Sequence, residues 1–182
     1  MIAFLFLKNT PLHRLTFQKV SISPKCKYIG SKLFLAQICR KIFIMNYKEI
    51  AKETIGNLYK AHNSIRKSGI DEKLIALVEL RVSQINGCAY CCSYHAKELS
   101  DFGFEQDIIN RLPGWKHTQV FNDQQKLVLE WAESVIYNKE DWKSTKAKLI
   151  DQFTEREIVE LTASITLMNT LNKLRITLAE ED

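Results

Sequence analysis

Apolar residues recur at intervals of three and four along most of the chain, from Tyr47 to Leu174. This spacing places them on one face of successive α-helices, and no run alternates with the two-residue period of a half-buried strand. Glycine and proline, six and three in 182 residues, are too scarce for the many tight turns of an all-β protein. The pattern therefore predicts an all-α domain of about six or seven helices.

Capping residues and glycines predict the ends of these helices. The first runs from about Tyr47 and is ended by Gly69, and Asp71 is a good N-cap for the second. The pair Asn86-Gly87 is a strong stop signal, so a third helix should begin near residue 88 and end at Gly103. The remaining helices are expected at about 105–112, after the capping boxes that begin at Asn122 and Thr154, and around 144–153, with a loop near Trp115.

The charge is distributed unevenly along the chain. Residues 1–44 carry eight basic residues and no acid, whereas residues 45–182 carry eighteen basic residues and twenty-one acids, a net charge of −3. We therefore interpret 1–44 as a basic N-terminal extension, either a leader or a segment upstream of the true start at Met45, and 45–182 as the folded domain. Because the domain is slightly acidic, we expect no nucleic-acid partner. No apolar run approaches the roughly 20 residues of a membrane span, so we expect no membrane partner either.

Four residues that can carry chemistry lie close together after the Asn86-Gly87 stop. If a helix begins near Cys88, then Cys88, Cys91, Cys92 and His95 fall at i, i+3, i+4 and i+7 and share one face. The first turn of a helix favours a thiolate, and an imidazole one turn from a thiol can take its proton. Two cysteines separated by two residues can also close a disulfide, so one can attack an oxidant and the other can resolve the product.

Glu79 is the carboxylate that we expect to assist this cluster. It lies near the middle of the preceding helix among Ile75, Val78 and Val82, a partly apolar setting in which a carboxylate needs a partner. A tight helix–turn–helix would bring it beside Cys91 and His95, where it could orient the imidazole and stabilise its charged form. The simpler interpretation is a surface glutamate paired with a lysine or arginine.

The order Glu79, Cys88-x-x-Cys91, His95 resembles the alkylhydroperoxidase D-like members of the carboxymuconolactone decarboxylase superfamily. The stretch ELRVSQINGCAYC is similar to the usual wording of that family. The stretch EREIVELTASITLMNTLNKL resembles its closing helix, with Asn169 and Asn172 at the two asparagine positions. Tyr90 stands where the larger two-repeat peroxidases carry a second histidine, so the chain looks more like the short single-repeat branch.

This resemblance implies an all-helical subunit that assembles into homotrimers or homohexamers and reduces peroxides. By that likeness Cys91 is the peroxidatic thiol, Cys88 is the resolving thiol, and His95 with Glu79 is the proton relay. It also implies that no cofactor is needed beyond the Cys88–Cys91 disulfide. Electrons would arrive at Cys88 from an external thiol or a lipoylated protein. Cys92 is an extra thiol that could form an alternative disulfide or pack in the core.

Several alternatives stay open. Cys88, Cys91 and His95 could bind a metal ion with Cys92, His62 or Glu79 as fourth ligand, although no second ligand cluster follows. A decarboxylase of the same superfamily, a general thiol–disulfide oxidoreductase and a helical oligomerisation module with structural cysteines are also possible. A redox-active CxxC pair beside a histidine is typical of a reducing compartment, so we expect a cytoplasmic enzyme.

Overall fold

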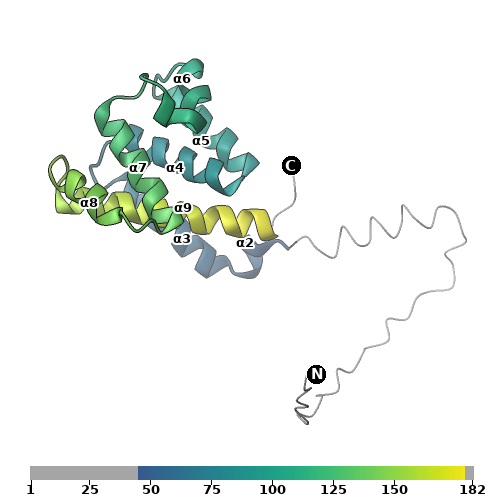
Figure 1. Cartoon of the computed structure of the whole chain (residues 1–182). Helices are drawn as coiled ribbons and strands as arrows, with labels where there is room; N and C mark the ends of the chain where they lie inside the picture. The colour runs from purple at the N-terminus through teal and green to yellow at the C-terminus, as the bar shows by residue number, and fades with distance from the viewer. Residues whose placement is uncertain (1–44, 179–182) are drawn as a thin grey trace, which may run out of the picture.

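A computed structural model of the chain describes residues 45–178, and the structural statements below concern this part. It contains eight α-helices and one 3-10 helix, without a strand among the described residues (Figure 1). The all-α prediction is thereby confirmed. The predicted basic extension, residues 1–44, lies outside the described residues, so the boundary at residue 45 stays a prediction. The elements are α2 (Tyr47–Ile50), α3 (Lys52–Arg66), α4 (Glu72–Asn86), α5 (Ala89–Asp101), α6 (Gln106–Arg111), η1 (Leu112–His117), α7 (Asp123–Tyr137), α8 (Trp142–Ile150) and α9 (Glu155–Leu178).

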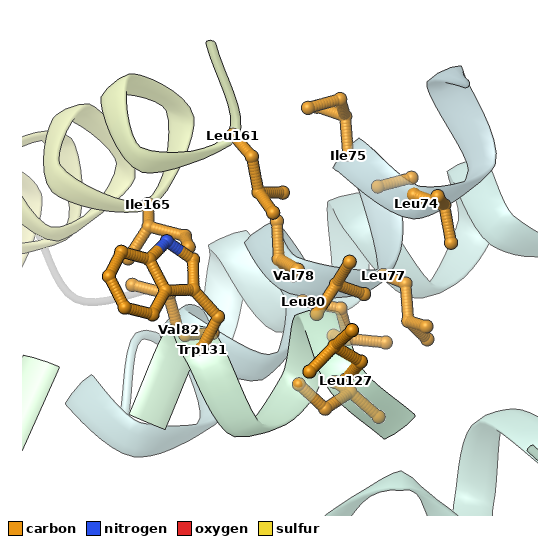
Figure 2. Packing of buried hydrophobic residues seen from close by; sticks show 14 of the residues in the cluster. Leu74, Ile75, Leu77, Val78, Leu80, Val82, Leu127, Trp131, Leu161 and Ile165 are labelled. Atoms are coloured by element: carbon orange, nitrogen blue, oxygen red, sulfur yellow. The ribbon is translucent and has the colours of Figure 1, made fainter. Parts of the chain in front are cut away.

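Helix α4 is the centre of the domain. It packs against α5, α7 and α9, and its apolar side chains Leu74, Ile75, Leu77, Val78, Leu80 and Val82 are almost completely buried. Figure 2 shows these side chains among Leu127 and Trp131 of α7 and Leu161 and Ile165 of α9. A helix that is apolar on nearly all sides is one that is covered on nearly all sides. Any polar side chain on α4 that faces its neighbours must therefore find a partner inside the protein.

The predicted helix ends are largely confirmed. The side chain of Asp71 accepts a hydrogen bond from the amide of Lys73 at 2.8 Å, and Gly87 and Gly103 adopt positive φ angles of 71° and 88°. Both predicted capping boxes, Asn122 with Gln125 and Thr154 with Glu157, form their reciprocal hydrogen bonds.

Three details differ from the expectation, and the first two raise the number of helices. The first helix is interrupted at Ala51, whose φ and ψ of −119° and 47° are not helical. The loop expected near Trp115 is the 3-10 helix η1, whose second residue is Pro113. Helix α8 begins at Trp142 and ends at Ile150, earlier than expected.

A buried carboxylate fixes η1 against the central helices. The Oε1 atom of Glu133 in α7 accepts hydrogen bonds from Arg81 of α4 at 2.7 Å and from the Trp115 indole at 2.8 Å. Its Oε2 atom accepts from Lys116 at 2.6 Å and Lys139 at 3.3 Å. Burial would raise the pKa of Glu133, but these hydrogen bonds and the charge of Arg81 outweigh it and lower the pKa to about 2. Glu133 is therefore a charged anchor that joins three elements.

None of the helices in residues 45–178 is both long enough and apolar enough to cross a bilayer.

Candidate active site

The turn between α4 and α5 brings the cysteines to the start of a helix. Gly87 has the left-handed conformation that ends α4, and the amide of Cys88 then donates to the Ser83 carbonyl at 3.0 Å. The Asn86 side chain donates to Oδ1 of Asn169 at 3.0 Å and to Oδ1 of Asn172 at 3.1 Å, both in α9. The chain thus enters α5 at a fixed place, with Cys88 as the N-cap residue.

Cys88 and Cys91 form a disulfide across the first turn of α5, with their Cα atoms 5.3 Å apart. Both residues are nearly buried, at 2% and 9% exposure. Cys92 is the free cysteine of the described part of the chain; it packs against the hydrophobic core, and burial raises the pKa of its thiol. The expectation that all four residues share one face therefore holds only in part, because Cys92 is directed to the core.

Glu79 is completely buried in the middle of α4, and side chains from three other helices surround it. Ser164 of α9 donates to its Oε1 atom at 2.8 Å. Arg66 of α3 donates to its Oε2 atom. Nε2 of His62, also in α3, lies 3.1 Å from Oε1 but is not aligned for a regular hydrogen bond. Glu79 is paired with an arginine, as the simpler interpretation proposed, but inside the protein and not on its surface.

His95 has carboxylate oxygens on one side of its ring. Its Nδ1 atom lies 3.0 Å from Oε2 of Glu98 and 3.5 Å from Oε2 of Glu79. Because ionised carboxylates only accept hydrogen bonds, Nδ1 is the nitrogen that carries the proton in the neutral ring. Nε2 then carries the lone pair and can act as a base.

The charges around His95 do not balance while the imidazole is neutral. Glu79 and Glu98 each carry a negative charge, and Arg66, which donates to Glu98 at 2.8 Å as well as to Glu79, supplies one positive charge. Burial would raise the pKa of both carboxyl groups. Contacts with His62, Arg66 and His95 lower the pKa of Glu79, and contacts with His95 and Arg66 lower that of Glu98. Both groups are therefore ionised, and Arg66 compensates one of their two negative charges, with His95 and His62 beside them.

A pocket of about 340 Å³ opens onto this cluster. Cys91, His95 and His62 line it, together with Met168 and Leu171 of α9. Its size is at the lower end of the range usual for small-molecule sites. Two of the four residues predicted for the site, Cys91 and His95, line the pocket. The other two do not line it: Cys88 is bonded to Cys91, and Glu79 lies beside His95.

Sequence reasoning missed Glu98, Arg66 and Ser164, and gave His62 only a possible role as metal ligand. Glu98 had a local signal, since it follows His95 by three residues and so shares its face of α5. His62 and Arg66 are one turn apart on α3, but nothing in the sequence indicates that this face contacts Glu79.

The same cluster is relevant to the metal site that the sequence left open as an alternative. Glu79, His95 and Glu98 present ligand atoms within 4.8 Å of one another, a set that differs from the cysteine-based set considered there. Arg66 donates to both carboxylates and so supplies the positive charge that a metal ion would bring. The two cysteines of the expected set are joined to each other.

Comparison with known proteins identifies the family. The family model called carboxymuconolactone decarboxylase family matches residues 52–134, a range that contains Glu79, both paired cysteines and His95. A crystal structure from Agrobacterium tumefaciens, of a protein of unknown function named as a candidate AhpD antioxidant defence protein, is 28% identical. It covers 76% of this chain and 98% of its own, with a TM-score of 0.67. The family model and this AhpD-like neighbour together support the AhpD/carboxymuconolactone decarboxylase superfamily for this chain.

Other similar proteins carry little functional information. The uncharacterized protein YdfG of Bacillus subtilis is 26% identical over 134 residues, 72% of this chain and 91% of YdfG. The uncharacterized protein YnjA of Escherichia coli is 25% identical over 105 residues, 57% of this chain and 58% of YnjA. An uncharacterized peroxidase-related protein from Silicibacter sp. TM1040 is 16% identical, with a TM-score of 0.64 over 87% of this chain and 89% of its own, and shows the fold alone.

Proposed function

We propose that this protein is a thiol peroxidase that reduces organic hydroperoxides or hydrogen peroxide through Cys91 and Cys88. One observation carries the proposal: Cys91 and His95 line the same pocket, and Cys91 is within bonding distance of Cys88. The start of α5 favours a thiolate at Cys91, and His95 can hold the proton that the thiol gives up. Glu79 and Glu98 stabilise the imidazolium that results.

The reaction cycle follows from this arrangement. The Cys91 thiolate attacks one peroxide oxygen, the O–O bond breaks, and the alkoxide leaves as an alcohol with the proton held by His95. Cys91 becomes a sulfenic acid, which the Cys88 thiol attacks to form the disulfide and release water. An external dithiol then reduces the disulfide by two electrons and two protons, and is itself oxidised to a disulfide.

The burial of both sulfur atoms restricts the reductant. Because both cysteines are nearly buried and a pocket reaches Cys91, the site favours a small or extended thiol over a thiol on the surface of a globular protein. A small thiol or a dithiol on a thin arm, such as a lipoyl group, can enter the pocket. A reducing compartment such as the cytoplasm would supply these thiols. The same burial favours peroxide reduction over general thiol–disulfide exchange with proteins, because a peroxide is small.

The test is to mix the reduced protein with an organic hydroperoxide and count the peroxide consumed per chain. We expect one peroxide per Cys88/Cys91 pair and a loss of two hydrogen masses by intact-protein mass spectrometry. Cys91→Ser should abolish the consumption, whereas Cys92→Ser, a matched change at the next residue, should retain it. If Cys91→Ser consumed as much peroxide as the parent, the assignment would be wrong. The same spectra report any bound metal.

A further inference from the structure

Reduction of the disulfide needs a proton acceptor in the pocket. An incoming thiol reacts as its thiolate, so it must lose a proton before its sulfur attacks. Cys91, which is 9% exposed, lines the pocket, whereas Cys88, which is 2% exposed, does not. The incoming sulfur therefore meets Sγ of Cys91, although the family resemblance implies that electrons arrive at Cys88. A base for this thiol has to line the same pocket.

His62 of α3 lines this pocket together with Cys91 and His95. Its Nε2 atom is buried and lies 3.1 Å from Oε1 of Glu79, which is ionised. Because an ionised carboxylate only accepts hydrogen bonds, Nε2 is the nitrogen that carries the proton in the neutral ring. Nδ1 then carries the lone pair, and it is the ring nitrogen that remains for a ligand in the pocket. His62 is thus a base with a carboxylate behind it.

Glu79 contacts both imidazoles, one at each of its oxygens. Nε2 of His62 lies at Oε1, and Nδ1 of His95 lies 3.5 Å from Oε2. Glu79 and Glu98 supply two negative charges, and Arg66, which contacts both, supplies one positive charge. A proton that His62 takes from a thiol is therefore held beside an excess of negative charge, which stabilises the imidazolium.

Accessibility distinguishes His62 from His95 as the base for this step. The His95 side chain is 4% exposed, and the ring of Tyr94 stands edge-on to it, with the ring centroids 5.1 Å apart. The His62 side chain is 18% exposed. An incoming thiol therefore reaches His62 more readily, and His95 stays with Cys91, the thiol one turn away on its own helix.

We propose that His62 is the base that activates the reductant: it takes the proton of an incoming thiol, whose sulfur then attacks Cys91. This inference rests on the proposed function and assigns a residue to the second half of its cycle. A bond forms between the reductant sulfur and Cys91, the Cys88–Cys91 bond breaks, and Cys88 leaves as a thiolate that takes up the proton. The second thiol of the reductant displaces Cys91 in the same way. The reductant becomes a disulfide, and the protein gains two electrons and two protons.

The experiment follows the thiol step alone, starting from protein whose Cys88–Cys91 disulfide has been formed with diamide. Two thiols of nearly the same shape, ethanethiol and trifluoroethanethiol, are compared at neutral pH. Fluorine makes the second thiol far more acidic, so a large fraction of it is already thiolate and needs no base. The reaction is quenched with iodoacetamide. Mass spectrometry then gives the rate at which the disulfide opens and the cysteine that carries the added thiol.

His62→Gln should slow the reaction of ethanethiol about a hundredfold and that of trifluoroethanethiol by no more than about threefold. Glutamine can still donate a hydrogen bond to Glu79, but it is not a base. His117→Gln, the same change at an exposed position in η1, should leave both rates unchanged. His62→Asn should shift the ratio of the two rates in the same direction, and it keeps the test available if His62→Gln does not fold. In the parent the added thiol should be on Cys91.

An equal effect on the two thiols in His62→Gln and His62→Asn, or no effect on either, would overturn the inference, because a structural role does not depend on the acidity of the thiol. Attachment of the thiol to Cys88 in the parent would also overturn it. The proposed function fails on a different observation. If peroxide does not convert the reduced protein to the disulfide form, the peroxidase proposal is wrong, and the thiol step is still measured on protein oxidised with diamide.

Discussion

At the scale of single residues, the chemistry depends on which carboxylate contacts His95. Glu79 was the predicted partner, but Glu98 is closer to Nδ1, at 3.0 Å against 3.5 Å. The two differ in what surrounds them: Glu79 is completely buried and contacts α3, α5 and α9, whereas the Glu98 side chain is 22% exposed. Loss of Glu79 therefore disturbs the packing of the domain as well as the site, and Glu98 is the better residue with which to test the relay.

We predict that Glu98→Gln slows the reduction of peroxide roughly tenfold, because the imidazolium of His95 loses a stabilising negative charge. The alkylation of reduced Cys91 by iodoacetamide, followed against pH, should reach half of its maximum at a higher pH in the variant, since the thiolate–imidazolium pair forms less readily. Glu105→Gln, the same change at an exposed residue just before α6, is the control. An unchanged alkylation profile in Glu98→Gln would remove Glu98 from the relay.

At the scale of elements, two buried carboxylates each join several elements of the fold. Glu79 connects α4 to α3, α5 and α9, and Glu133 connects α7 to α4 and η1. Each is a buried acid surrounded by donors, and in each the contacts outweigh the cost of burial and lower the pKa. One arrangement thus serves the candidate active site, and the other only fixes the fold.

The Glu133 anchor makes a prediction about stability against pH. Its pKa in the folded protein is about 2 and its ordinary value is 4.5, so its contribution is complete above about pH 4.5 and is lost as the pH falls toward 2. Glu133→Gln should lower the free energy of unfolding by about 3 kcal/mol near neutral pH, since Arg81, Lys116 and Lys139 lose their partner. In urea titrations the difference between parent and variant should shrink between about pH 5 and about pH 3. A difference that stays constant over this range would contradict the role of Glu133.

At the scale of the whole molecule, the described part closes on itself. The amide of Met45 donates to the carbonyl of Leu178 at 3.2 Å, so the two ends of the described region meet beside α9. The family model begins at residue 52, within this region. The domain boundary near residue 45 stays a prediction, which a shortened chain can test.

We predict that a chain beginning at Met45 keeps the melting temperature of the full chain within about 2 °C, because residues 45–178 bury an extensive hydrophobic core of their own. It should also consume the same amount of peroxide. Differential scanning fluorimetry and the peroxide assay check both expectations. Aggregation of the shortened chain, or a melting temperature lower by about 10 °C, would show that residues 1–44 belong to the domain.

The oligomeric state is a second prediction at this scale. Several large apolar side chains are exposed in the single subunit, among them Ile50, Val159 and Ile150 at 73%, 66% and 57% exposure. Such residues are often covered in oligomers, which agrees with the trimer or hexamer that the family resemblance implies. Sedimentation equilibrium should give a mass of three or six chains. A monomer at micromolar concentration would contradict the prediction.

The sequence by itself determined the helical class, most of the helix ends, and the group Cys88, Cys91 and His95. These features are local: capping residues, glycines and residues three or four apart act within one or two helical turns. It also indicated Glu79, because a carboxylate among apolar residues of one helix must find a partner.

Only the tertiary structure decided what surrounds Glu79 and the pocket. Ser164 and Arg175 come from α9, far along the chain, and Arg66 and His62 come from α3, the helix before α4. Their positions depend on how α9 packs against both α4 and α3. Burial and long-range charge pairing are properties of that packing, since they depend on which faces meet. For this reason the sequence could name the candidate thiols, whereas the charges that surround them could be assigned only from the folded protein.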